Sequence, residues 1–368
     1  MIWLVIVGLI AAAITTGALI VLVRPIMDGR MLWPTLGAAA AGALLTIGLG
    51  SLLGIAPLGY LIGVSAFAVP ILVLLEAAAI DSGADRISRW IVLFAWGAIV
   101  FPLAALVPLW LTAACAGTYC ELEDFGGALP LLVSSSAFVL LAWLPAGVVK
   151  RASADPHSNR RAMLALLVLW FAVVLWLVQL EGAIDEFVPR ILLAGLVVPV
   201  AGGLGWLIAD RARGVFRPIR RSLVLGVIAG LAAVLPGAVT VTFPWTIAVG
   251  SLAGALGSLV YSKRGLTSSG IATRWGLVIL VAVTVGIIAP AIAGDTVGIL
   301  FSANLGVLST PVTSLLGVTL LSVVVSAPAW VLLRRTVSRD RMPAIIHADA
   351  DADAATDVAA AGASRRKR

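Results

Sequence analysis

Apolar runs of at least about 18 residues recur from one end of the chain to the other, and short polar segments separate them. A helix of about 20 residues crosses the hydrocarbon core of a bilayer and satisfies its own backbone hydrogen bonds there. The pattern therefore predicts an all-α membrane protein. Its eleven expected transmembrane helices cover residues 2–23, 33–54, 57–79, 88–113, 127–148, 162–180, 188–208, 220–236, 241–261, 274–293 and 308–333.

The connections between these spans are short, so we expect one eleven-helix transmembrane domain over residues 1–341. The first span lacks a small-residue cleavage site followed by a soluble domain, and we expect a retained helix rather than a signal peptide. Beyond Arg341, alternating alanine and aspartate lead to a basic end at 365–368. Low hydrophobicity and blocks of charge predict a disordered cytoplasmic tail over 342–368, whose basic end is suited to touch anionic membrane lipid.

Basic residues gather in every second loop. If alternate loops are cytoplasmic, beginning after the first span, Arg190 is the only basic residue left on the outer side. The positive-inside rule then predicts an outer N-terminus, a cytoplasmic C-terminus and a multi-pass protein of the cell membrane. The net charge of +7 has the same origin. We expect no nucleic-acid binding, which would require a basic face on a soluble module.

Composition excludes several other classes of protein. Hydrophobic residues make up 61% of the chain, charged residues make up 12%, and the mean hydropathy is +1.11, which excludes a soluble globular domain. The chain has no histidine placed for a catalytic triad, no glycine-rich loop followed by lysine and no cluster of metal ligands. We therefore expect no enzyme activity, no metal and no cofactor.

The two cysteines, Cys115 and Cys120, lie in an acidic loop on the predicted outer side. This spacing in an oxidising compartment favours a small disulfide-closed ring that staples the loop. Two unpaired thiols at a helix end are the alternative.

The stretch Asp124-Phe125-Gly126-Gly127 stands where this loop meets the fifth span. Asp124 is suited to cap the first free amides of the helix and to complement its positive dipole end. The two glycines let another backbone approach closely, as helices do inside a bilayer. The same four residues resemble the Asp-Phe-Ala-Gly-Gly signature that opens the fifth helix of ammonium transporters.

Other stretches agree with this resemblance in order and spacing. The similar stretches are 17–36, Pro156-His157-Ser158, Leu169-Trp170-Phe171, Gly205-Trp206-Leu207, Pro236-Gly237 and Phe243-Pro244-Trp245. They extend over spans one to ten, most of the chain. On these residues the chain resembles a divergent member of the ammonium transporter and Rhesus protein family.

The resemblance implies a homotrimer in which each subunit encloses a narrow pore. It also implies two inverted five-helix repeats with one extra helix strapped across them, and the predicted topology permits such a repeat. In the family, ammonium passes an outer aromatic vestibule and a phenylalanine gate, and then meets two facing histidines from helices five and ten. The family's tail often binds a PII-type regulator, but no segment here matches, so we do not expect that partner.

The pore histidines of the family have no counterpart here. Alignment on the two glycines places the first histidine position at Leu131 or Leu132, and alignment on Trp275-Gly276 places the second at Val278. The only histidines, His157 and His347, belong to predicted cytoplasmic segments. The sequence thus predicts a pore without paired imidazoles.

Two further positions indicate a bulkier and drier pore. Trp176 falls at a gate phenylalanine of the family, and Leu180 falls at a serine that accepts the ion. Large apolar groups exclude ions because they offer no hydrogen bonds and favour dewetting. Trp176 at the membrane interface, as part of an aromatic belt, is the alternative.

Few polar groups remain inside the spans. Glu76 is a carboxylate within a hydrophobic run, which marks a functional candidate, but it also stands close enough to the cytoplasmic end to pair with Arg86 or Arg89. The serines at 134–136 are suited to bond helix carbonyls or to line a polar pocket.

Three hypotheses follow. The chain conducts ammonium, ammonia or another small neutral solute; or it is a non-conducting pseudo-transporter that serves as a scaffold or partner subunit in a membrane complex; or it is an unrelated transporter.

Overall fold

A computed structural model describes residues 2–27, 33–54, 56–81, 84, 86–114, 122, 124–140, 160–262, 271–295 and 298–331. In these ranges, ten helices are long and apolar enough to cross a membrane, and a shorter apolar helix covers Leu129–Leu140. Each of these helices overlaps one of the predicted spans, and residues 141–148 of the fifth predicted span lie outside the described ranges. Cys115, Cys120, both histidines and the tail 342–368 lie outside the described residues.

The first five spans form the first half of the molecule. Their elements are α1 (Ile2–Met27), α2 (Trp33–Leu52), α3 (Leu58–Asp81), α4 (Arg86–Phe94), the π-helical η1 (Ala95–Val100), α5 (Phe101–Ala114), the π-helical η2 (Leu129–Val133) and α6 (Ser134–Leu140). The fourth span combines α4, η1 and α5, and the described part of the fifth combines η2 and α6. Both of these spans thus contain a π-helical turn, a feature often found at functional sites.

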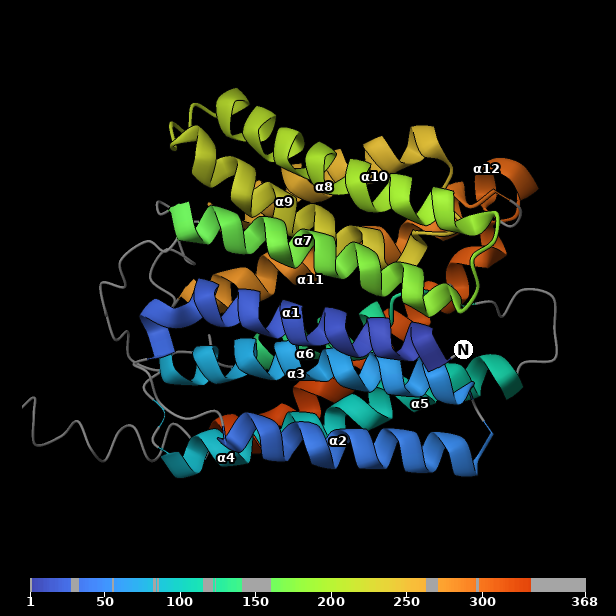
Figure 1. Cartoon of the computed structure of the whole chain (residues 1–368). Helices are drawn as coiled ribbons and strands as arrows, with labels where there is room; N and C mark the ends of the chain where they lie inside the picture. Colours follow the sequence, from blue (N-terminus) through green and yellow to red (C-terminus); the bar gives the residue numbers. More distant parts are fainter. Residues whose placement is uncertain are drawn as a thin grey trace, which may run out of the picture.

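The second half consists of five longer helices and a final span. Its elements are α7 (Arg160–Glu181), α8 (Phe187–Ala212), α9 (Ile219–Gly237), α10 (Phe243–Tyr261), α11 (Ile271–Ala293), the short α12 (Ile299–Ser302), the 3-10 helix η6 (Leu305–Leu308) and a helix over 309–331. Figure 1 shows the helices of both halves lying side by side in one bundle.

The two halves pack in the same way. In the first, α3 contacts α1 and α2, and α2 contacts the fourth span; in the second, α9 contacts α7 and α8, and α8 contacts α10. The first helices of the halves, α1 and α7, pack against each other and run in opposite directions (Figure 1). The fifth helices, α6 and α11, also pack together. This matched packing fits the inverted repeat that the resemblance implies.

Glycines bring the helices of the second half into backbone contact. A methyl group added at Gly254 of α10 would lie 1.9 Å from the carbonyl oxygen of Gly202 of α8. Likewise, a methyl group at Gly226 of α9 would lie 2.4 Å from that same oxygen. Small residues permit this approach, which maximises packing where lipid supplies no hydrophobic driving force.

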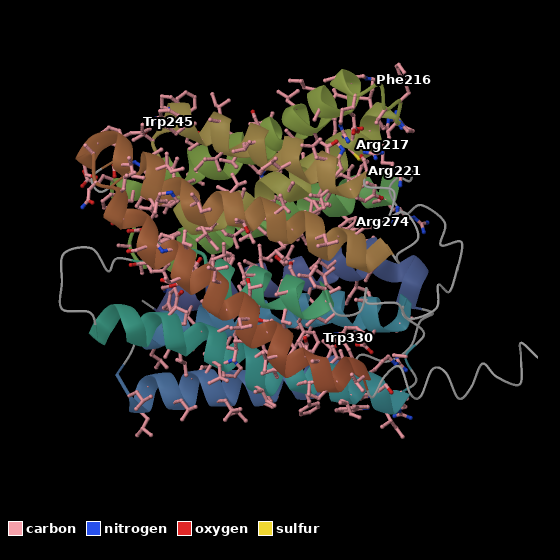
Figure 2. The ribbon with its side chains drawn as sticks, turned by 180° about the vertical axis from the view of Figure 1, so that it is seen from behind. Phe216, Arg217, Arg221, Trp245, Arg274 and Trp330 are labelled. Carbon is pink, nitrogen blue, oxygen red and sulfur yellow. The ribbon has the colours of Figure 1, made fainter. Side chains whose placement is uncertain are left out.

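The final helix, 309–331, runs diagonally across the bundle (Figure 2). Its Trp330 indole Nε1 donates a hydrogen bond of 2.8 Å to the carbonyl oxygen of Phe138 in α6. The two rings also lie 6.1 Å apart between centroids. The extra helix therefore straps across the first half, and Trp330 fixes it there.

A candidate pore between the two halves

The turn before η2 is built as the sequence predicts. The two carboxylate oxygens of Asp124 accept hydrogen bonds from the amides of Ala128 (2.6 Å) and Leu129 (2.8 Å), which caps the helix. Gly126 donates its amide to the carbonyl oxygen of Leu235 at 2.9 Å, and a side chain at Gly126 would clash with that oxygen at 2.8 Å. Gly127 adopts a φ of 57°, which glycine tolerates best.

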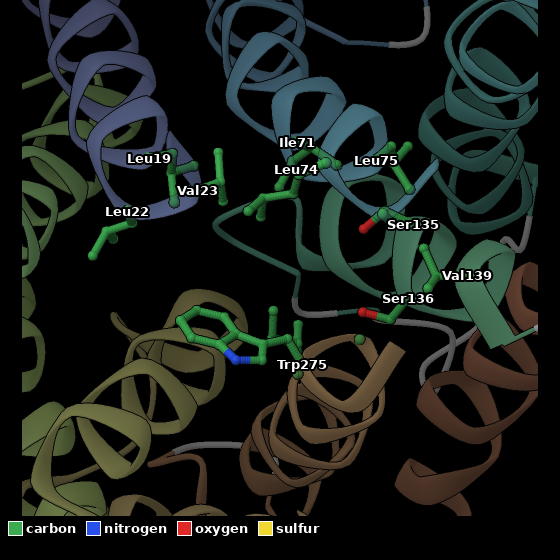
Figure 3. A pocket seen from close by; sticks show the side chains of 14 residues that line it. Leu19, Leu22, Val23, Ile71, Leu74, Leu75, Ser135, Ser136, Val139 and Trp275 are labelled. Atoms are coloured by element: carbon green, nitrogen blue, oxygen red, sulfur yellow. The ribbon is translucent and has the colours of Figure 1, made fainter. Parts of the chain in front are cut away.

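Two cavities lie inside the bundle beyond this turn, at the seam of the two halves. The larger, of about 100 Å³, is lined by residues of α1, α3, η2, α7, α9 and α11. The smaller, of about 70 Å³, is lined by residues of α1, α3, α6 and α11 (Figure 3). Leu19, Ile71, Leu74, Trp275 and Ile279 line both. Because they share these residues, the two cavities are neighbours, and we refer to them together as the path.

The walls of the path are almost entirely apolar. In the larger cavity, Thr15 contributes the only hydroxyl group of the lining. The smaller cavity adds Ser135 and Ser136 of α6 (Figure 3). Ser135 donates its hydroxyl proton to the carbonyl oxygen of Leu131 at 2.5 Å, so that group is occupied within its own helix. Such apolar walls offer water few hydrogen-bond partners.

Trp176 and Phe67 border the larger cavity together. Their rings stack with centroids 3.7 Å apart and planes 16° apart. Trp176 is only 1% exposed, so it lies inside the bundle and not in an interfacial belt. Its Nε1 has no hydrogen-bond partner within the described residues. The tryptophan therefore lines the larger cavity inside the bundle.

Gln179 lies one turn beyond Trp176 on α7. Its side chain is 4% exposed, and its Oε1 lacks a hydrogen-bond donor in the described part of the chain. A methyl group at Gly8 or Gly63 would lie 2.4 or 3.0 Å from this oxygen, so Gln179 fills the space between α1 and α3. Leu180 follows it and packs toward Gly63, outside the lining of both cavities.

The structure places both leucines of the first histidine position in the larger cavity. Leu131 and Leu132 of η2 line it, and Leu131 is 2% exposed. The π-helical turn also places Ser134, at the end of η2, against the fourth span, where its hydroxyl accepts a hydrogen bond of 3.0 Å from Trp96 Nε1. At the two positions that the alignment matched to the family's first histidine, the cavity wall therefore consists of hydrocarbon.

Val278, the residue matched to the second histidine, lies outside both cavities. It belongs to neither cavity lining, and a methyl group added at Gly257 of α10 would lie 3.3 Å from its Cγ1. It therefore faces α10, whereas Trp275 and Ile279 of α11 face the cavities. The residue next to it, Ile279, lines both cavities, because a shift of one residue turns a helix by about 100°.

Glu76 is buried and paired. Its carboxylate lies 3.4 Å from the guanidinium of Arg89, and Thr35 donates its hydroxyl proton to the other carboxylate oxygen. These contacts join α2, α3 and α4. Glu76 lines neither cavity, although its neighbours Leu75 and Ala77 line the smaller one. The pairing with Arg89 is one of the alternatives that the sequence left open, and it gives Glu76 a structural role.

Several lining residues were missed by sequence reasoning. Phe67, Thr15 and Trp275 stand in ordinary apolar helices, and nothing in the local pattern marks them as inward-facing. Which apolar face of a helix lines a cavity depends on how the helix packs against its neighbours, and the sequence does not record that packing. The hydroxyl of Thr15 was the one available signal, as a polar group in the middle of an apolar span.

Comparison with solved structures identifies this arrangement. Mep2 of Candida albicans superimposes with a TM-score of 0.65 and 18% identity, over 92% of this chain and 84% of that one. The Saccharomyces cerevisiae Mep2 gives 0.68 and 16%, over 93% and 89%. The chain has the ammonium transporter fold. A protein described as a sensor Amt protein agrees, with a TM-score of 0.71 and 14% identity over 91% and 92% of the two chains.

No protein-family model and no curated protein sequence match this chain. The likeness is thus one of fold, and identities of 14 to 18% leave the lining side chains free to differ. None of the residues that line the two cavities is a histidine. An ammonium-transporter fold here surrounds a path of leucine, isoleucine and tryptophan.

Proposed function

We propose that this chain is a transport-type protein of the cell membrane, assembled as a homotrimer, in which each subunit passes a small neutral solute. Ammonia is the first candidate. The single observation that carries the proposal is the apolar path at the seam of the two halves, with Leu131, Leu132 and Ile279 in its walls.

The lining favours a neutral solute over an ion. An unpaired charge in an apolar cavity loses its hydration and gains nothing in return, which costs far more than the same step for a neutral molecule. No histidine is present among the lining residues to take or give a proton. Ammonium would have to leave its proton outside this path.

Unsatisfied polar atoms favour a solute that forms hydrogen bonds. Thr15 Oγ1 and Trp176 Nε1, which belong to two residues in the lining of the larger cavity, are buried without hydrogen-bond partners within the described residues. Such groups are costly to leave unpaired. A small molecule with both a donor and an acceptor, such as ammonia, would pair with them in passing, whereas an apolar gas would not.

A second candidate is the non-conducting scaffold, a partner subunit in a membrane complex. The stack of Phe67 on Trp176 favours it, since ring centroids 3.7 Å apart leave no opening between the two side chains. Passage requires Trp176 to swing aside. If Trp176 never swings aside, the protein serves as a scaffold that presents its surface to a partner.

The test uses purified protein in vesicles of saturated lipid, which slows passive entry of ammonia. An ammonium jump is applied while internal pH and membrane current are recorded, with empty vesicles and a twin-histidine transporter as controls. Passage of neutral ammonia raises internal pH faster than in empty vesicles and produces no current.

The outcomes separate the candidates. A current that grows with ammonium concentration would show that ions cross and would contradict the neutral-solute proposal. The absence of any signal, from protein shown to be folded and trimeric, would favour the scaffold, and a co-purifying membrane protein would then be sought.

A further inference from the structure

The smaller cavity has a hydroxyl-bearing side and a hydrocarbon side. Ser135 and Ser136 of α6 direct their hydroxyl groups into it, and Leu19, Leu22 and Val23 of α1 form the side opposite to them (Figure 3). Among the described residues that line this cavity, none carries a charged side chain. A molecule held here would therefore meet hydrogen-bonding groups at one end and apolar groups at the other.

Ser136 supplies hydrogen-bonding capacity that the protein leaves unused. The residue is 3% exposed, and its hydroxyl forms no hydrogen bond with another described residue. A serine within a helix commonly donates its proton to the carbonyl one turn earlier, as Ser135 does to Leu131 at 2.5 Å. The Ser136 hydroxyl instead faces the cavity. Since a buried hydroxyl is costly to leave unpaired, this arrangement indicates a partner inside the cavity.

The two hydroxyl groups determine what the polar end of that partner must offer. Ser135 uses its proton within the helix, so its oxygen is available only as an acceptor. Ser136 still has a proton to donate. The partner therefore needs an acceptor for Ser136 and a donor for Ser135. A primary carboxamide carries a carbonyl oxygen and an N–H group side by side, whereas an alcohol must make both bonds through one oxygen atom.

The absence of charge in the lining separates a carboxamide from an amine. A primary amine is protonated near neutral pH, and its charged form would lose its hydration in this cavity without gaining a counter-charge. The described lining also contains no histidine that could take the proton. A carboxamide is neutral at any pH at which the protein is folded, so it enters without giving up a proton.

The volume of the cavity allows a ligand larger than ammonia. The cavity measures about 70 Å³, whereas a single water needs only about 15 Å³ when space is counted in the same way. A molecule of several non-hydrogen atoms therefore fits. The hydrocarbon side favours a ligand with a short alkyl group, because that group leaves water when it contacts Leu22 and Val23.

We propose that the smaller cavity is a binding site for a small neutral primary carboxamide, with acetamide as the simplest example that has an alkyl end. The carbonyl oxygen accepts the proton of Ser136, an N–H group donates to the oxygen of Ser135, and the methyl group lies toward α1. The inference rests on the function proposed above, because it adds a class of solute to the same path.

The test is a titration of purified full-length protein in detergent micelles with acetamide, followed by saturation-transfer NMR and corrected for empty micelles. Two further probes are N,N-dimethylacetamide, which keeps the carbonyl group but has no N–H, and ethanol, which has a single hydroxyl group. These comparisons use the unmodified protein, so they do not depend on the folding of any variant.

Ser136→Ala is the main variant. It removes a hydroxyl group that pairs with no other described residue, so the protein should fold normally. Ser322→Ala is the matched control, because Ser322 is a buried serine of the final helix and lines neither cavity. The two variants lose the same atom from equally buried positions, and only the first loses it from the proposed site.

Acetamide is expected to bind saturably. A single hydrogen bond contributes about fivefold to affinity, so Ser136→Ala should bind acetamide about fivefold more weakly, and Ser322→Ala should bind it as the parent does. N,N-Dimethylacetamide and ethanol should bind the parent at least about fivefold more weakly than acetamide. No saturable binding, equal affinity for either comparison probe, or an equal loss in Ser322→Ala would each overturn the inference.

Passage of acetamide and of ammonia into vesicles is measured separately from binding. Saturable binding of acetamide in micelles, without passage of either solute, would support the site and contradict the proposed transport function. Passage of ammonia through a protein that does not bind acetamide would support that function and overturn the site.

Discussion

Trp176 of α7 lies flat against Phe67 of α3, with ring centroids 3.7 Å apart. The two residues come from different halves of the molecule, so their contact closes the seam along which the cavities lie. Stacked rings are a favourable but breakable contact, worth about 1 kcal/mol beyond the area they bury. In the function proposed above, the opening of this stack decides between passage and a permanent seal.

Trp176→Ala is expected to open the seam. Removing a buried indole leaves a void beside Phe67, and it should destabilise the fold by about 3–5 kcal/mol while raising solute passage several-fold. Phe171→Ala is the control, because Phe171 stands on the same helix with 59% of its surface exposed. The measurement is the rate of internal pH change after an ammonium jump. Unchanged passage in a folded Trp176→Ala protein would refute the assignment of the stack as a gate.

A histidine pair is expected to function at Leu131 and Ile279 and not at Leu131 and Val278. Leu131 and Ile279 line the same cavity, whereas Val278 faces α10. Combining Leu131→His with Ile279→His places two imidazoles on one path, where they can relay a proton. The check is ammonium-dependent current in vesicles. Equal currents from the Ile279→His and Val278→His combinations would contradict the orientation of α11.

Asp210 and Asp295 are expected to differ sharply in their effect on stability. Asp210→Asn leaves Arg213 and Arg217 without their buried carboxylate and should destabilise the protein by about 3 kcal/mol or more. Asp295 pairs with Arg190 at the surface, where both side chains are about one-third exposed, and Asp295→Asn should cost less than about 1 kcal/mol. Thermal unfolding of the two variants, in the same detergent, measures this difference. Comparable losses would show that the Asp210 cluster is not a structural centre.

Asp124 gives stability a defined pH dependence. Burial raises the pKa of Asp124 from its ordinary value of 3.8 to about 6, against the lowering effect of the amides of Leu129 and Ala128. The folded state therefore binds more protons than the unfolded state between these values. Its stabilising contribution is complete below about pH 4 and is lost as pH rises through about 6.

Asp124→Asn removes this titration. The free energy of unfolding of the parent minus that of the Asn variant should therefore fall as pH rises from 4 to 7 around the pKa of about 6. Chemical unfolding at several pH values checks the trend. A difference that stays constant, or that grows with pH, would show that the carboxylate is ionised throughout and that its role as a cap dominates.

Much of the fold was readable from the sequence. Apolar runs long enough to cross a bilayer located the spans, because the backbone of a lipid-embedded segment must satisfy its own hydrogen bonds as a helix. Asp124, Gly126 and Gly127 predicted a capped turn and a close backbone approach, and both are present. The expectation of a pore without paired histidines rests on the positions of His157 and His347 alone, and both lie outside the described residues.

Only the tertiary structure determined the direction in which individual side chains point. A helix that is apolar on every side gives no signal for which side meets a cavity, so Val278 was chosen where Trp275 and Ile279 face inward. Phe67 became a candidate only through its contact with Trp176, which lies more than 100 residues away in the chain. Bilayer length and helix chemistry are local properties that a sequence records, whereas a path between two repeats exists only after their helices have packed.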